Sequence, residues 1–375
     1  KELLYSYQAP EISPLIHLLG PASLEDSGAN VFTEERKWQL AADAGFTSFQ
    51  TGNWNLGSTW TNGGCASSCI EGTDYPGASD TATISAGHTV TITADHSASN
   101  VTINSTGTLD TDNNSRNLTL TGTSGTLLTR SGTFTAGNST TTITSASGSP
   151  LFSSAFTTFN NVTINSNASI INNSNSVTIN GNLNIQAGVF CSRRAITGPG
   201  SGSGTFTIAS GAKLCLGGTA NSTVSTCDGG ATSIFGSNMA TFQTYDFHAS
   251  SSVVWLSNAA QTISDVPQYG NLSFTPVLTT NRAYTFSGAA STTSLTIVPT
   301  ATAGATFNTV LGSGGLTVSA TTTASTTSAT SAGISTSGNP FWTGNLDIGA
   351  DGSASIDSIM TLTGPAGSTL ITKHS

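Results

Sequence analysis

The chain repeats a short phrase in which a small or amide residue is followed by an aliphatic, a polar and a second aliphatic residue. This alternation predicts short β-strands that are buried on one side. Each strand has too few aliphatic side chains to bury a core alone, but strands stacked about 4.8 Å apart would line them into a continuous column. The phrases occupy residues 89–92, 100–103, 117–120, 161–164, 176–179, 182–185, 271–274, 294–297, 315–318 and 345–348.

The phrases recur at irregular steps of roughly 10 to 30 residues, broken by Gly, Asn and Ser, so each is most simply one rung of a stacked coil. We therefore predict an all-β fold, a parallel β-helix or β-solenoid, whose body runs from about residue 80 to about residue 370. A disordered Ser/Thr linker would lack the alternating aliphatic residues. The residues expected to point inward include Val101, Ile103, Val162, Ile164, Leu183, Ile185, Leu272, Leu295 and Ile297.

Asn-rich corners fit the same architecture, because Asn tolerates left-handed backbone and forms hydrogen-bonded ladders between rungs. Asn160 with Asn161, and the run at 172–175, are the corners expected to behave in this way.

Composition restricts the partners of such a body. Charged residues make up 8% of the chain, against about 25% in typical soluble domains, so uncharged Ser, Thr, Asn and Gly must supply most of the wetted surface. The formal net charge is −9, and Lys and Arg together number 10. Because no basic stripe is available to neutralise phosphates, we expect no nucleic-acid partner.

The chain has the features of an exported protein. No apolar run approaches the length that spans a bilayer, and the first residue is Lys1. Five cysteines and two methionines suit an oxidising environment, where disulfides persist. We expect an extracellular or cell-surface chain whose signal peptide has been removed, with no membrane span and no cofactor.

The cysteines suggest two disulfides. Cys65 and Cys69 bracket the residues 66–68 (Ala-Ser-Ser) in a Gly-rich loop, so a local disulfide is expected there. A zinc site would need two more ligands nearby, and none is evident in the sequence. Cys191 and Cys215 are about one coil apart and would stack as a cross-rung disulfide. A Cys215–Cys227 bond is the competing pairing.

Residues 1–50 differ from the rest because charged residues concentrate there. A helix is expected from Thr33 to Asp43, with Thr33 as its N-cap and Gly45 as its end. The predicted organisation is an N-terminal arm with a short helix at 1–50, a Trp- and Gly-rich start of the β-helix at 51–110, and a solenoid body at 111–375.

The segment after the arm resembles a known kind of β-helix start. Residues 52–60, 75–84 and 86–90 read GNWNLGSTW, YPGASDTATI and AGHTV. They resemble the opening of large bacterial surface β-helix proteins and the extracellular domain named for its eight glycines, over roughly residues 50–110. The resemblance implies that paired tryptophans, a Pro-Gly-x-x-Asp turn and a Gly-His-x-Val strand begin a β-helix, and that His88 is structural.

A catalytic centre is not expected. Many β-helices cleave acidic polysaccharides, but such sites gather several carboxylates beside Arg or Lys. Here Asp110 and Asp112, with Arg116 nearby, are more simply explained as an acidic turn. The Arg193-Arg194 doublet is explained equally well by binding of an acidic sugar and by a soluble surface loop. The tryptophans Trp54, Trp60, Trp255 and Trp342 either stack on sugar rings or, as we favour, pack in the core or in end caps.

We therefore expect a non-enzymatic extracellular structural protein that assembles with itself, its N-terminal arm adding strands to a neighbouring subunit. The alternatives are a glycan-binding or glycan-cleaving β-helix, such as an adhesin, a polysaccharide lyase-like protein or a phage tail-spike; surface glycans would then be partners. The residues expected to mediate assembly are Leu3, Leu4, Tyr5, Tyr7, Ile12, Leu15, Ile16, Leu18 and Leu19.

Overall fold

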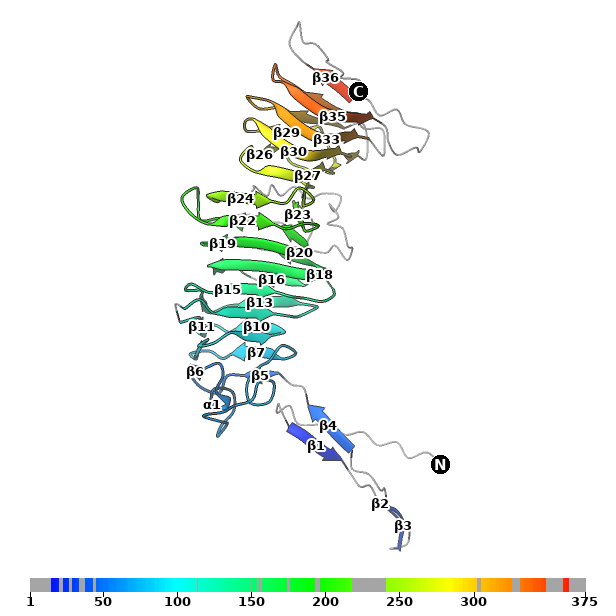
Figure 1. Cartoon of the computed structure of the whole chain (residues 1–375). Helices are drawn as coiled ribbons and strands as arrows, with labels where there is room; N and C mark the ends of the chain where they lie inside the picture. The colour runs from blue at the N-terminus through cyan, green and yellow to red at the C-terminus, as the bar shows by residue number, and fades with distance from the viewer. Residues whose placement is uncertain are drawn as a thin grey trace.

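The structure is a computed structural model in which the strands stack into a long β-solenoid (Figure 1). It describes residues 15–19, 23–26, 29–33, 38–42, 45–217, 241–348 and 360–363, with gaps at 113, 149, 154, 156, 174–175, 193–195, 302–304 and 326–330. All strand pairs of the solenoid are parallel, as expected when successive coils stack in the same direction.

Three ladders of parallel strands run along the solenoid. The first and third ladders share long strands that turn a corner, and so they merge into one 18-stranded sheet. The first ladder contains β5 (Phe46–Thr47), β7 (Thr81–Ile84), β10 (Asn100–Ile103), β13 (Thr126–Arg130), β16 (Leu151–Ser153), β23 (Lys213–Leu216) and β25 (Ser252–Trp255). The third contains β9 (His96–Ala98), β12 (Asn117–Leu120), β15 (Thr140–Ile143), β22 (Thr205–Ile208) and β24 (Thr244–Phe247). The shared strands are β18 (Asn161–Asn173), β20 (Leu183–Ser192), β27 (Gln268–Phe274), β30 (Ala290–Ile297), β33 (Leu316–Ala324) and β35 (Phe341–Ile348).

The second ladder is made of smaller sheets. It comprises β6 (Gly52–Asn53), β8 (Thr89–Thr91), β11 (Thr108–Asp110) and β14 (Thr133–Thr135), then β17 (Thr157–Phe159), β19 (Val177–Ile179) and β21 (Ile196–Thr197), and finally β26 (Gln261–Ile263), β29 (Arg282–Phe286), β32 (Thr306–Val310), β34 (Ser331–Ser335) and β36 (Met360–Thr363). A further pair, β28 (Val277–Leu278) with β31 (Thr300–Ala301), stacks separately. The all-β solenoid predicted from the sequence is thus confirmed.

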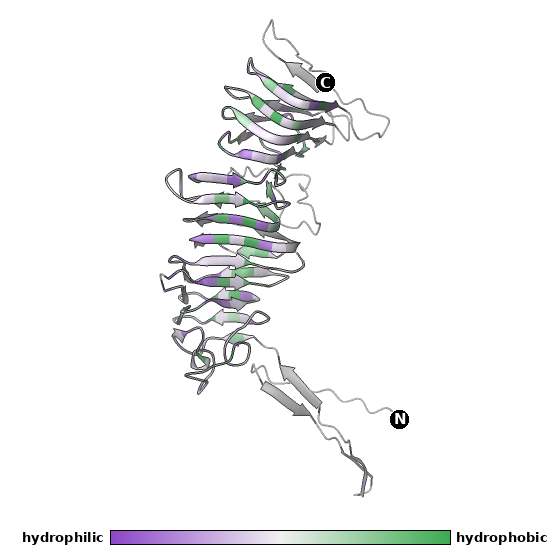
Figure 2. Ribbon diagram, viewed as in Figure 1, coloured by the Kyte–Doolittle hydropathy of each residue, from purple (hydrophilic) through white to green (hydrophobic). Residues whose placement is uncertain are grey.

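The core follows the repeated phrases. Val162 is aligned with Leu183, and Leu183 with Phe206, so one coil takes 21 residues in the first step (183 − 162) and 23 in the second (206 − 183). Figure 2 shows apolar residues alternating with polar ones along the strands. The inward positions predicted above are all buried: Val101, Ile103, Val162, Ile164, Leu183, Ile185, Leu272, Leu295 and Ile297.

Asparagine side chains link successive coils at one corner, as predicted for Asn161. The backbone N–H of Asn182 donates to Asn161 Oδ1 at 2.8 Å, and the N–H of Thr205 donates to Asn182 Oδ1 at the same distance. Each amide oxygen therefore accepts from the backbone of the next coil rather than from another amide side chain. The side chains of the second predicted run, 172–175, lie outside the described residues.

The N-terminal arm has strands where a helix was predicted. β3 (Ala29–Thr33) pairs antiparallel with β2 (Ser23–Asp26), and β4 (Trp38–Ala42) pairs antiparallel with β1 (Leu15–Leu19). The backbone of segment 38–42 is paired with β1, an apolar strand that is distant in the sequence. Such pairing overrides a weak local preference for helix. The one described helix is the short α1 (Gly57–Trp60). No described helix is both long and apolar enough to cross a membrane.

Candidate functional site

The N-terminal end of the solenoid is closed by a segment that we call the cap, residues 54–80 (Figure 1). Its aromatic side chains lie over the first coils. Trp54 and Trp60 contact each other edge to face, with ring centroids 5.2 Å apart, and Trp60 contacts Phe46 of β5 at 6.2 Å. Trp54 has no exposed surface and Trp60 is 5% exposed. This arrangement covers the apolar column that the first rung would otherwise present to water.

Both cap tryptophans are hydrogen-bonded inside the fold. Trp54 Nε1 donates to the carbonyl oxygen of Pro76 at 3.1 Å, and Trp60 Nε1 donates to that of Trp54 at 2.7 Å. Buried tryptophans whose indole N–H groups are satisfied in this way are packing residues rather than platforms for a sugar ring.

The cap also buries a histidine. His96 of β9 stacks on Trp54 with centroids 5.9 Å apart, and Tyr75 contacts it edge-on at 5.6 Å. Burial lowers the pKa of His96 from 6.5 to about 4, and the nearby charge of Asp95 opposes this shift only in part. His96 is therefore a neutral packing residue at physiological pH. His88 is structural in a different way, because its Nδ1 atom lies 2.9 Å from the Ser48 hydroxyl in a hydrogen bond.

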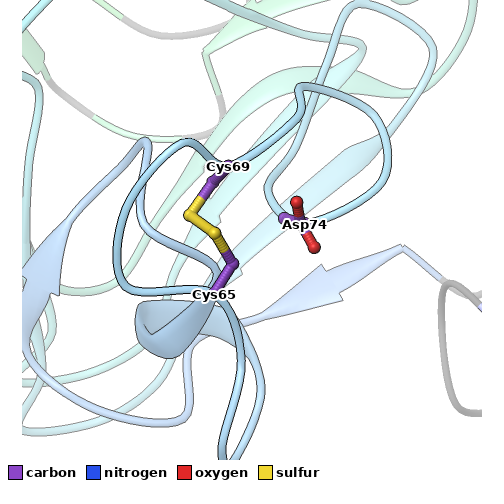
Figure 3. Close-up of side chains that lie close together, drawn as sticks. All are labelled: Cys65, Cys69 and Asp74. Atoms are coloured by element: carbon purple, nitrogen blue, oxygen red, sulfur yellow. A yellow bond between two sulfur atoms is a disulfide. The ribbon is translucent and has the colours of Figure 1, made fainter.

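Cys65 and Cys69 form the predicted disulfide, with Cα atoms 5.6 Å apart (Figure 3). The backbone N–H of Gly57, the first residue of α1, points to Cys69 Sγ at 3.4 Å. Asp74 lies beside the disulfide, and the two sulfur atoms and one carboxylate oxygen are all within 4.8 Å of one another. Sequence reasoning missed Asp74, although its position five residues after Cys69 in the same Gly-rich loop was a usable signal.

The other predicted disulfide, Cys191–Cys215, would link two strands that are neighbours in the first ladder. Cys191 of β20 is aligned with Cys215 of β23, and both side chains are buried. They pack with Leu256 in a small apolar cluster separate from the main core, and each is disulfide-bonded. The alignment is the one that a cross-rung bond requires. Because Cys65 bonds Cys69 and the remaining Cys227 could pair with only one cysteine, two bonded cysteines at 191 and 215 must bond each other, as predicted. Cys227 lies outside the described residues.

The acids weighed as catalytic candidates shape a turn. The backbone N–H of Asp112 donates to Asp110 Oδ1 at 3.0 Å, and Asn114 Nδ2 donates to Asp112 Oδ2 at 3.0 Å. Asp112 has a positive φ of 56°, which Asp adopts more readily than most residues. These contacts favour the structural interpretation of the pair. Arg193 and Arg194 lie outside the described residues.

The four tryptophans considered above as sugar-stacking candidates divide into two environments. Trp255 has no exposed surface, like Trp54, whereas Trp342 of β35 is 55% exposed. Core packing thus holds for three of them and is wrong for Trp342. Of the predicted assembly residues, Leu15, Ile16, Leu18 and Leu19 form β1, whereas Leu3, Leu4, Tyr5, Tyr7 and Ile12 lie outside the described residues.

No family model, curated protein or solved structure matches this chain. The solenoid fold is established by the parallel strand pairing described above. The likeness of residues 50–110 to the domain named for its eight glycines is a resemblance of sequence motifs, and no matching family model supports it.

Proposed function

We propose that this chain is an extracellular structural protein, a β-solenoid subunit that assembles head to tail into a filament at a cell surface. The observation that supports this function is the position of the exposed apolar side chains. Of the exposed large apolar side chains, Phe49 and Ile70, 52% and 62% exposed, belong to the N-terminal end, and Leu346 and Trp342 belong to β35 near the other end, whereas Val266 lies between the two ends. Exposed apolar residues at opposite ends are suited to contact between subunits.

Leu346 marks a place where the core column is open. Leu295, Thr322 and Leu346 are aligned on successive coils and point inward. Leu295 and Thr322 have no exposed surface, whereas Leu346 is 37% exposed. A further layer on this coil would bury Leu346 as its two predecessors are buried.

The arm is suited to provide such a layer. β1 with β4, and β2 with β3, form two-stranded sheets that are separate from the solenoid sheets. An isolated two-stranded sheet is marginally stable in water and gains stability from a further strand or an apolar surface. A contact between the arm of one subunit and the open coil of the next joins two different surfaces, so it need not close into a ring and generates a filament.

Sedimentation and electron microscopy of the full chain, with substitutions at the open coil, test this proposal. Leu346→Asp should yield monomers, because it places a charge in the proposed contact. Val266→Asp is the matched control, since Val266 is 67% exposed in the loop between β26 and β27, away from both ends. Filaments of wild type and Val266→Asp but not of Leu346→Asp are expected. Monomeric wild-type protein, or unimpaired filaments of Leu346→Asp, would contradict the proposal.

Glycan binding is the second candidate, and the exposed ring of Trp342 favours it. An exposed indole offers an apolar face on which a sugar ring can stack. Retention of the chain on a panel of insoluble polysaccharides, lost in Trp342→Ala but not in Val266→Ala, would support this function.

A further inference from the structure

We infer that the cap is also a metal site when its disulfide is reduced: Cys65, Cys69 and Asp74 would then bind a thiophilic divalent cation of the Zn²⁺ type. These three residues form the one group of possible metal ligands in the described part of the chain. In Figure 3 the Asp74 carboxylate lies beside the two sulfur atoms. Neither the disulfide nor the proposed assembly contact assigns a role to the Asp74 carboxylate.

The spacing of the ligands suits a zinc-like ion. Cys65 and Cys69 are separated by three residues, within the two-to-four-residue spacing of structural zinc ligands. Around a tetrahedral ion with bonds of about 2.3 Å to sulfur and about 2.1 Å to oxygen, neighbouring ligand atoms are roughly 3.6 to 3.8 Å apart. The carboxylate oxygen, now within 4.8 Å of the sulfur atoms, needs to approach them by about 1 Å. The two sulfur atoms, bonded to each other in the disulfide, must separate by roughly 1.7 Å once that bond is reduced.

Neighbouring backbone groups already support these ligands. The Gly57 N–H that points to Cys69 Sγ favours the thiolate, which is the metal-binding form. Asp74 Oδ2 accepts from the backbone N–H of Ile70 at 2.8 Å, which orients the carboxylate. Hydrogen bonds of this kind fix ligand orientation in metal sites. All three ligand residues are half-buried, so an ion and a water molecule in the fourth position can enter from solvent.

The chemistry requires a reductant. A dithiol transfers two electrons and two protons to the Cys65–Cys69 bond, the S–S bond breaks into two thiols, and the dithiol is oxidised to a cyclic disulfide. The cation then binds both sulfurs and displaces their protons to solvent. In this scheme a metal bridge replaces the disulfide as the link that closes the loop.

Cobalt(II) is the probe for this site, because its bonds to thiolates absorb in the near ultraviolet. The full chain is reduced with dithiothreitol, freed of the reductant under anaerobic conditions and titrated with Co²⁺. We expect one Co²⁺ per chain, displaced by Zn²⁺, and no such band in the oxidised chain. Asp74→Asn should weaken binding by more than about tenfold, since losing a ligand should cost at least as much as losing an outer hydrogen bond, about 10- to 100-fold.

Three variants serve as controls. Cys65→Ser should abolish the two-thiolate band, Asp246→Asn, at an exposed acid far from the cap, should leave it unchanged, and Cys191→Ser should retain it. Since folding of a cysteine variant is not guaranteed, protection of Cys65 and Cys69 from alkylation by bound Zn²⁺ is also measured in the reduced wild type by mass mapping. Absence of the band and of protection, equal affinity of Asp74→Asn, or a band that depends on Cys191 would overturn the inference.

Discussion

At the scale of single residues, consecutive side chains of one strand have opposite roles. Ile164 has no exposed surface, whereas Thr163, the residue before it in β18, is half-buried on the outer side of the sheet. Ile164→Asp places an uncompensated charge in the stacked core and should cost several kcal/mol of unfolding free energy. Thr163→Asp should change it by less than about 1 kcal/mol. Urea denaturation followed by circular dichroism measures both; equal losses would place Ile164 outside the core.

His96 makes the stability of the cap depend on pH. An unfolded histidine titrates near pH 6.5, whereas folding lowers the pKa of His96 to about 4. Between these values the unfolded chain binds more protons, so the contribution of His96 is complete above about pH 6.5 and is lost as the pH falls towards 4. His96→Phe keeps an aromatic ring against Trp54. Between pH 7 and pH 4.5, the melting temperature of this variant should fall by less than that of the wild type. Identical losses would show that other groups, such as the carboxylates common to both proteins, account for the acid sensitivity.

At the scale of the element, a rung needs room for the rung beneath it. A Cβ atom added to Gly132, just before β14, would lie 2.3 Å from the carbonyl oxygens of both Asn104 and Gly107 in the preceding coil. These are backbone atoms, so Gly132→Ala must push two coils apart and should destabilise the chain by about 1–3 kcal/mol. Gly202→Ala is the control, because a Cβ there meets no atom within 4 Å and its φ is not in the left-handed range. Thermal unfolding of the two variants tests the prediction, and equal midpoints would refute it.

At the scale of the whole molecule, the arm and the solenoid have separable roles. Deleting residues 1–20 removes β1, the partner of β4, but no strand of the solenoid sheets. The truncated chain should therefore keep its β-sheet circular dichroism and melting temperature while sedimenting as a monomer. Filaments of the truncated chain would show that the arm is not the connecting element, even if Leu346→Asp still blocks assembly through the open coil.

Local alternation was enough to predict the stacked coils, because a phrase such as 161–164 can bury Val162 and Ile164 only on one side of a strand, wherever its neighbours lie. The Cys65–Cys69 disulfide was predictable for a similar reason, since five consecutive residues determine most of its geometry.

Other features depend on residues that are distant in the sequence, and the tertiary structure alone decided them. Segment 38–42 has the composition of a helix, but pairing with 15–19 makes it a strand. Asp74 joins the cysteines because the cap folds back on itself, and Leu346 differs in exposure from Leu295 because of its place in the stack. A sequence pattern specifies which side of a strand is apolar, whereas the neighbours that complete a site or leave a coil open are supplied by long-range contacts.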